Sequence, residues 1–324
     1  MRKRDRIRVV LLAGLMLGAS ACVTVDLLGG RPKPLKETVI FGEAGPKILL
    51  IDISGVIDER SSTPSLFSAP KENRIARLRE ELRRAADDDE VRALLLRINS
   101  PGGTATASDL IYHEIERFKS KHDIPVIAQL MGTATSGGYY VAVAADEIHA
   151  QPTTITGSIG VIFVSINLAG LMEKIGIQNQ TLTSGRFKDA GSWLRRMRPE
   201  ERQQLQSVLE AAFERFKQVV AAGRENLSAA QVDELADGRI YSAPQALANG
   251  LIDGIGYLEE AVERAEKRAH LTESRVVTYH RPREYRDNLY THSGIPTTIE
   301  LDWLPDGLPT EGPSLLYLWA PGWD

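Results

Sequence analysis

The chain has 324 residues, 43% of them hydrophobic and 25% charged, a composition typical of a soluble protein with one large core or two smaller ones. Its formal net charge of −4 and its aromatic content of 6% argue against a nucleic-acid partner and against a surface that stacks bases. The single cysteine, Cys22, excludes an intrachain disulfide, and the scattered histidines lack a metal-binding spacing, so no metal site is expected.

The N-terminal segment, residues 1–28, is predicted to anchor the protein at a membrane. Residues 1–8 carry five basic side chains, and an apolar run follows over residues 9–25. This is the secretory pattern, in which the positive end stays in the cytoplasm, so the rest of the chain is expected outside it. Three interpretations remain open. The stretch before Cys22 (ASAC) resembles a lipoprotein box that would lipidate this cysteine, the apolar run could remain as a transmembrane anchor, or it could be a buried helix, which the basic cluster disfavours.

Residues 29–46 are predicted to be a tether, and from residue 47 strands and helices alternate. Strands are expected at residues 47–54, 91–99, 125–130, 146–150 and 176–183. Helices are expected at residues 73–86, 104–121, 136–145, 199–226, 229–236, 243–249 and 257–268. The alternation predicts an α/β domain over residues 47–271, with helices packed on a mostly parallel sheet. Because the pattern decays afterwards, residues 272–324 are expected to form an irregular extension, lying on the domain or on a partner subunit.

Two glycine turns follow predicted strands at positions suited to chemistry. RINSPGG, at residues 97–103, exposes backbone N–H groups at a strand-to-helix junction, although the motif could be only a tight turn. ATSGG, at residues 134–138, places Ser136 where a helix begins and its dipole favours developing negative charge. The alternative is that Ser136 serves only as an N-cap.

A nucleophilic serine needs a proton acceptor, and the histidines are poorly placed for that role. His149 lies within a predicted strand, where a structural role is expected, and the later histidines lie at a helix end and in the extension. Lys188, in the glycine-bounded loop 184–192, is the other candidate base, although most exposed lysines are only solvated charges. A lysine acts as a base only when it is neutral, a form that burial favours.

Four motifs, in this order along the chain, resemble those of the signal peptide peptidase A (protease IV) family of bacterial serine peptidases, in its single-domain form. They are RINSPGG, TSGGYY, TGSIGV and SGRFKDAGSW, and the resemblance covers residues 47–268. It implies a ClpP/crotonase-like fold of repeated ββα and βα units and a homo-oligomer. It also implies a location in the bacterial cell envelope on the extracytoplasmic side, and hydrophobic peptide substrates, above all remnant signal peptides.

The same resemblance implies roles for five residues of this sequence. Ser136 is the expected nucleophile, Lys188 the general base, and Ser158 the side chain that orients the lysine. The backbone N–H groups of Gly103 and Gly137 are the expected oxyanion donors. Together they predict peptide hydrolysis through an acyl-enzyme, without a cofactor.

Two other functions remain open at this stage. A crotonase-type enzyme acting on acyl-CoA would share the fold, but it would need carboxylate acid and base groups near the PGG turn and a cytoplasmic location. A non-catalytic scaffold that binds peptides at the membrane would be favoured only if Ser136 or Lys188 were missing, and both are present.

Overall fold

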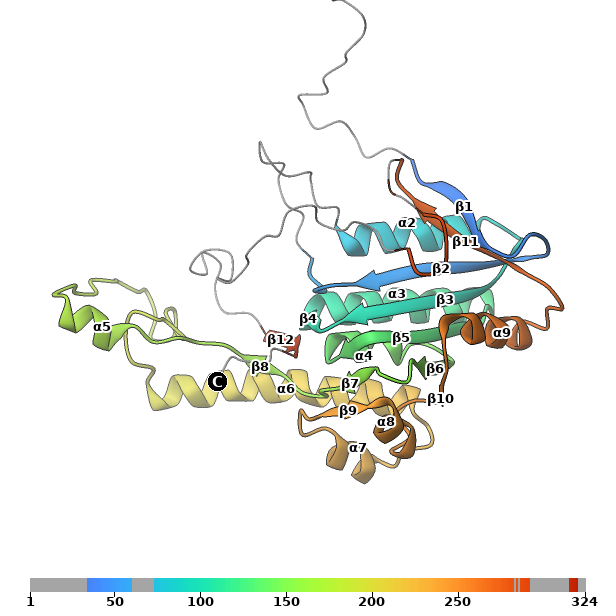
Figure 1. Ribbon diagram of the computed structural model, residues 1–324. Coiled ribbons are helices and arrows are strands. Elements are labelled where there is room, and N and C mark those ends of the chain that lie inside the picture. The colour runs from blue at the N-terminus through green and yellow to red at the C-terminus, as the bar shows by residue number, and fades with distance from the viewer. Residues whose placement is uncertain (1–33, 60–72, 283, 285, 292–314, 320–324) are drawn as a thin grey trace, which may run out of the picture.

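A twisted sheet, mostly parallel, runs through the centre of the computed structural model, which describes residues 34–59, 73–282, 284, 286–291 and 315–319 (Figure 1). Its strands are β1 (Lys36–Phe41), β2 (Lys47–Ser54), β3 (Val91–Ser100), β5 (Val126–Thr135), β6 (Glu147–Ala150), β7 (Ile155–Gly157), β9 (Ile240–Ser242), β10 (Gly254–Ile255) and β11 (Arg275–His280). They lie in the order β1-β11-β2-β3-β5-β6-β10, and β7 and β9 extend the sheet from β5. Every pair is parallel except β1 with β11 and β7 with β9.

Helices cover both faces of this sheet. The helices of the described residues are α2 (Arg74–Ala86), α3 (Ala105–His122), α4 (Gly137–Ala142), α5 (Ala169–Lys174), α6 (Pro199–Gly223), α7 (Ala229–Leu235), α8 (Ala243–Ala248) and α9 (Leu258–Arg268). Of these, α5 lies away from the sheet (Figure 1). Along β2, Leu49 and Ile51 belong to the core formed with α2, α3 and α4, whereas Ile48 and Leu50 belong to the core formed with α9. Burial on both faces explains why the central strands read as unbroken apolar runs in the sequence.

A second, small sheet lies at the carboxyl ends of the central strands. It contains β4 (Gly102–Thr104), β12 (Leu315–Leu318) and β8 (Ile162–Phe163), with β12 in the middle and antiparallel to both neighbours. β4 and β8 are separated in the chain by α3 and α4, and β12 lies near the C-terminus. The small sheet therefore joins parts of the chain that are far apart in sequence.

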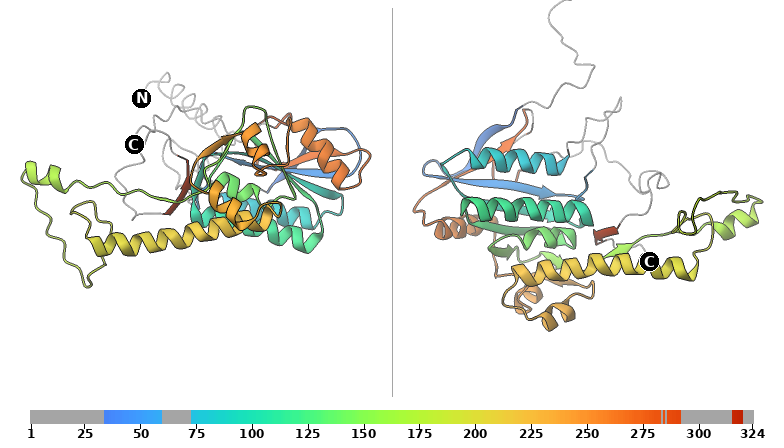
Figure 2. Two further views of the ribbon diagram at one scale, coloured as in Figure 1. Left: turned by 90° about the horizontal axis from the view of Figure 1, so that it is seen from below. Right: turned by 180° about the vertical axis from the view of Figure 1, so that it is seen from behind.

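Residues 162–198, which we call the arm, project away from the sheet together with the start of α6 (Figures 1 and 2). No residue from 160 to 200 is buried. The arm contains α5 and a long stretch of loop, so its conformation depends on local contacts rather than on the core.

Most predicted elements are confirmed within a few residues, but the strand expected at 176–183 is wrong. That segment is exposed loop in the arm, where no neighbouring strand is available to pair with it. The segments expected as tether and irregular extension contain β1, β11 and β12. The sheet therefore extends beyond the predicted bounds of 47–271, because strands from both ends of the domain pair with each other.

The predicted anchor, with Cys22, lies outside the described residues. Among the helices that the structure does describe, none combines the length and the apolar character needed to cross a bilayer.

Candidate active site

Ser136 lies between the end of β5 and the start of α4, at a backbone conformation that few non-glycine residues adopt. Its φ and ψ are 51° and −115°. Its side chain makes no capping hydrogen bond, which excludes the simple N-cap interpretation, and the residue is only 1% exposed. Strain of this kind persists only where the surroundings hold it, and it concentrates at functional positions. Ser136, with its strained backbone and a hydroxyl that makes no capping hydrogen bond, is therefore the first candidate for a catalytic residue.

The two glycines after Ser136 permit a close approach between α4 and the turn that follows β3. A Cβ on Gly138 would lie 2.7 Å from the carbonyl oxygen of Ser100, and one on Gly137 would lie 2.4 Å from Oγ of Ser108. Any larger residue would push the helix away from the turn. The glycine pair thus brings the first turn of α4, with its N–H groups, against the PGG motif.

The PGG turn provides the other half of this contact. Gly102 has a φ of +103°, and a Cβ there would lie 2.7 Å from the backbone nitrogen of Gly137. Gly103 needs to be glycine for another reason, because a Cβ would lie 1.8 Å from the carbonyl oxygen of Ile57. The predicted oxyanion donors Gly103 and Gly137 therefore come from two turns that meet. Gly102 is not among the site residues predicted from the sequence, although the double glycine was the available signal.

Ser158 is brought to the same place by the pairing of β5 with β7. Thr135 lies opposite Gly157, and the N–H of Ser136 donates to the carbonyl oxygen of Gly157 at 2.7 Å. Ser158, the next residue, is buried, has a φ of 53° and donates its N–H to Arg239 at 2.8 Å. Two serines with positive φ thus sit at adjacent strand ends.

Lys188 is the one predicted site residue that a single chain does not bring to this group. It is exposed in the arm, which projects away from the sheet (Figure 1), whereas Ser136 directly follows the sheet strand β5. Its backbone N–H donates to the carbonyl oxygen of Gly185 at 3.0 Å. Among the described residues, no hydrogen bond or ion pair joins its side chain to Ser136.

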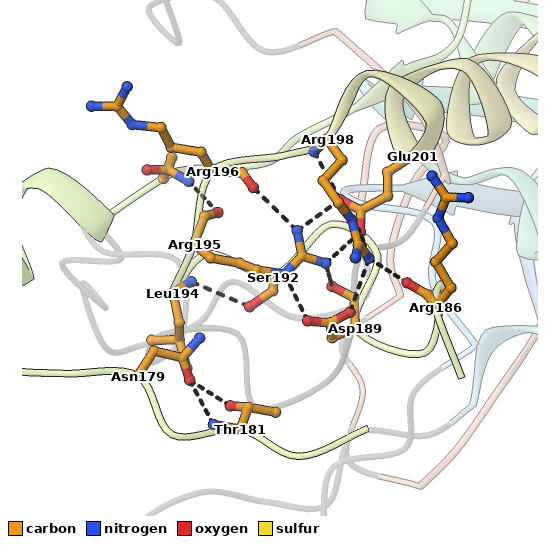
Figure 3. A network of polar contacts seen from close by, with 11 residues as sticks. Asn179, Thr181, Arg186, Asp189, Ser192, Leu194, Arg195, Arg196, Arg198 and Glu201 are labelled. Atoms are coloured by element: carbon orange, nitrogen blue, oxygen red, sulfur yellow. Dashed lines mark hydrogen bonds and ion pairs between the residues drawn. The ribbon is translucent and has the colours of Figure 1, made fainter. Parts of the chain in front are cut away.

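A network of polar contacts holds the loop on both sides of Lys188 (Figure 3). Nε of Arg195 donates to Asp189 at 2.7 Å, and Nη1 of Arg195 donates to Glu201, in the first turn of α6, at 2.8 Å. Arg198 donates to Glu201 as well and to the carbonyl oxygen of Arg186.

The electrostatics of this network favour the charged forms of its carboxylates. The hydrogen bond from Arg195 lowers the pKa of Glu201 to about 2, and the same guanidinium lowers the pKa of Asp189. The sequence signal for Glu201 was the acidic PEER start of the helix, but its arginine partners could not be identified from spacing alone. The network gives an otherwise exposed loop a defined shape.

No cluster of three or more histidine, cysteine or acidic side chains suited to hold a metal ion is found within the described part of the chain. His149, the histidine expected to be structural, is buried beside Glu147, and burial lowers the pKa of its imidazole. The residues gathered at the ends of β3, β5 and β7 are thus hydroxyls and backbone N–H groups, the components of acyl transfer.

Comparison with known proteins identifies related families. A family model described as peptidase family S49 matches residues 118–272, and one described as Clp protease matches residues 52–156. The second match confirms the predicted ClpP-like α/β fold.

Three curated relatives are similar over much of the chain. A protein of Enterococcus faecium, named as a candidate signal peptide peptidase SppA, is 37% identical over a region that covers 86% of this chain and 85% of the relative's length. A candidate protease of Synechocystis is 40% identical over 60% of this chain and 69% of its own. Protease 4 of Haemophilus influenzae is 36% identical over 68% of this chain, but only 34% of its own length is covered.

Proposed function

The chain belongs to peptidase family S49, the signal peptide peptidase A family, and is a serine peptidase; from this premise we propose that Ser136 and Lys188 form its catalytic dyad. The observation that carries the proposal is the position of Ser136. Its backbone is strained, the residue is buried, its hydroxyl makes no capping hydrogen bond, and it lies beside the glycines of two turns. Family membership also favours peptide hydrolysis over the acyl-CoA and scaffold alternatives.

The proposed mechanism assigns one step to each group. Neutral Lys188 takes the proton of Ser136 as its Oγ bonds to the substrate carbonyl carbon. The resulting oxyanion accepts hydrogen bonds from the N–H groups of Gly103 and Gly137, each contributing about 3 kcal/mol to the stability of the transition state. Lys188 then protonates the leaving amine, and water hydrolyses the acyl-enzyme and restores the Ser136 hydroxyl. Ser158 orients the lysine.

We further propose that Lys188 reaches the Ser136 of a neighbouring copy in a homo-oligomer. The arm that carries Lys188 exposes many large apolar side chains, an unfavourable arrangement in water for an isolated chain. Leu182 is the extreme case at 97% exposed. The others are Ile162, Val164, Ile166, Leu171, Ile175, Ile177, Phe187 and Trp193. Packing this arm on a neighbour would bury these side chains and would remove Lys188 from water, which favours the neutral amine.

The proposed substrates are hydrophobic peptides, including remnant signal peptides, in the bacterial cell envelope. The name of the Enterococcus faecium relative and the secretory pattern of residues 1–28 support this assignment. Replacing Cys22 by serine and following incorporation of a labelled fatty acid tests the lipid anchor. Label in the wild-type chain and its loss in the variant are expected, whereas a wild-type chain that is membrane-bound but unlabelled would favour a transmembrane segment.

The dyad is tested by peptide hydrolysis with Ser136→Ala and Lys188→Arg, both of which should fold and be inactive. Lys174→Arg is the matched control, because Lys174 is also exposed in the arm and should tolerate the change. Activity in Lys188→Arg would exclude a neutral lysine base, since arginine stays protonated.

Assembly in trans is tested by co-expressing Ser136→Ala with Lys188→Ala. A mixed oligomer should regain part of the activity, because some sites then combine an intact Ser136 with an intact Lys188 from another copy. A stable mixed oligomer without activity would place both residues of each site in one copy.

A further inference from the structure

The hydroxyl of Ser100, the last residue of β3, connects the PGG turn to the loop that follows β2. Ser100 is 0% exposed. Its Oγ accepts the N–H of Gly102 at 3.0 Å and donates to the carbonyl oxygen of Gly55 at 2.7 Å, whereas the carbonyl oxygen of Gly102 lies farther away, at 3.4 Å. A serine hydroxyl has one proton and two lone pairs, so it can accept from the turn and donate to the loop at the same time.

The loop after β2 also contacts the turn through its backbone. The N–H of Ile57 donates to the carbonyl oxygen of Gly102 at 2.8 Å. The loop is fixed to β3 in turn, because the N–H of Gly55 donates to the carbonyl oxygen of Asn99 at 2.9 Å. The loop is therefore bound both to the strand and to the turn, and the hydroxyl of Ser100 lies between them.

The contact with Ile57 determines where the N–H of Gly103 points. The described part of the chain has only trans peptide bonds, and in a planar trans peptide group the C=O and the N–H point in opposite directions. Since the C=O of Gly102 points at the N–H of Ile57, the N–H of Gly103 in the same peptide group points away from the loop. The orientation of this proposed oxyanion donor is therefore set before the reaction begins, as electrostatic stabilisation of the transition state requires.

The main chain of Ser100 also lies against the helix that carries the second proposed donor. A Cβ on Gly138, the residue after the donor Gly137, would lie 2.7 Å from the carbonyl oxygen of Ser100 and 3.3 Å from its Cβ. In the pairing of β3 with β5, Ser100 is opposite Ala134. A change at Ser100 therefore acts where the two turns meet.

We propose that Ser100 is a positioning residue for the oxyanion hole, because its hydroxyl fixes the orientation of the PGG turn and so the direction of the Gly103 N–H. The inference rests on the proposed function of Ser136 and Gly103. Two successive glycines have no side chains that restrict their backbone, so the turn depends on outside contacts for a single conformation. Without the hydroxyl, the N–H of Gly102 and the carbonyl of Gly55 lose their shared partner, and the donor is misdirected although the turn is still present.

Peptide hydrolysis with Ser100→Ala tests this role, with a fluorogenic amide of acetyl-Leu-Leu-Leu as substrate. We expect kcat to fall about 10- to 100-fold, less than for loss of a whole donor, with KM within about threefold of the wild-type value. The matched control is Thr154→Val, which should keep the wild-type kcat. Thr154 is 1% exposed, and its hydroxyl donates to the carbonyl oxygens of Leu130 and Met131 and to no residue of the PGG turn.

A peptide aldehyde gives a readout that a merely structural change would not move. With acetyl-Leu-Leu-leucinal, Oγ of Ser136 bonds to the aldehyde carbon, the π pair of the C=O moves to the oxygen, and the serine proton passes to Lys188. The adduct places an oxyanion where the transition state has one, so its Ki should rise by the same factor, about 10- to 100-fold. The pH dependence of kcat should keep its wild-type midpoint, because the proton acceptor is unchanged.

Two results would overturn the inference: wild-type kcat in Ser100→Ala, or a fall in kcat with an unchanged Ki for the aldehyde. If circular dichroism shows that Ser100→Ala does not fold, Ser100→Cys replaces it. Its thiol is a weaker donor and acceptor, so a smaller loss of both kcat and aldehyde affinity is expected, and no loss would equally refute the proposal. An inactive Ser136→Ala beside an unaffected Ser100→Ala refutes this inference alone, whereas an active Ser136→Ala refutes the proposed function itself.

Discussion

Glu201→Gln tests whether the arginine network positions the loop that carries Lys188. Glu201 is fully buried, and its carboxylate accepts from Arg195, from Arg198 and from the backbone N–H of Arg198 at 3.1 Å. Glutamine keeps one oxygen but replaces the other by an NH₂ donor, which faces guanidinium donors and cannot pair with them.

The expected size of the effect follows from the exposure of the two arginines. Hydrogen bonds to a charged group contribute about 1.5–3 kcal/mol each. The side chains of Arg195 and Arg198 are 23% and 40% exposed, so water partly replaces the lost contacts. A net loss of about 2 kcal/mol for the loop would lower the population of its ordered form by up to about 30-fold, at 1.4 kcal/mol per factor of ten.

Peptide hydrolysis with Glu201→Gln should therefore show a fall in kcat of up to about 30-fold with KM nearly unchanged, because the loop carries the proposed base, which acts in the chemical step. The melting temperature should stay within a few degrees, since Glu201 is buried against the arm, and residues 160–200 contribute no buried residue to the core. Glu210→Gln is the matched control, because Glu210 is exposed on the same helix and its hydrogen-bonding partner is the neutral Gln206. Wild-type kcat in Glu201→Gln, or a loss fully explained by unfolding, would refute the positioning role.

Three further predictions concern stability. Gly138→Ala should destabilise the fold by about 1–3 kcal/mol in thermal denaturation, because a Cβ there would lie 2.7 Å from the carbonyl oxygen of Ser100. The control Gly170→Ala, in the arm, should leave the stability unchanged, because a Cβ there would have no atom within 4 Å. Equal melting points of the two variants would contradict this prediction. Arg97→Met should lower the free energy of unfolding in urea by about 3–5 kcal/mol, because Arg97 is buried and ion-paired with Asp52 at 2.9 Å; an unchanged midpoint would count against it. The pKa of Glu201 falls from about 4.3 in the unfolded chain to about 2 in the folded one, so its carboxylate should stabilise the loop fully above pH 4.3 and progressively less toward pH 2. Hydrogen exchange of residues 186–201, corrected for intrinsic rates, measures this stability. Exchange that does not change over this pH range would refute the prediction.

The sequence alone determined much of the central fold. The apolar runs of β2, β3 and β5 and the amphipathic patterns of α2 and α9 are local signals, and the structure has these elements within a few residues of their predicted bounds. The glycine turns could also be placed at the ends of their strands, because a glycine pair after a buried strand has few other uses. These features depend on side chains close together in sequence.

The placement of the arm and of β12 could not be predicted in the same way. The segment 176–183 has strand-like apolar residues, yet it forms no strand because no sheet edge lies beside it. Tyr317 lies in a region without periodicity, and its burial depends on Tyr140 and Phe216, which belong to distant helices. Pairing between segments far apart in the chain depends on the whole fold.

The sequence by itself determined which groups were available for chemistry, namely Ser136, Lys188 and two glycine turns at strand ends. Only the tertiary structure decided the backbone strain at Ser136, the contact between the two turns and the separation of Lys188 from Ser136 in one chain. The physical reason is that residue type and spacing specify local conformation, whereas distances between side chains depend on which strands pair and on how the helices pack over them.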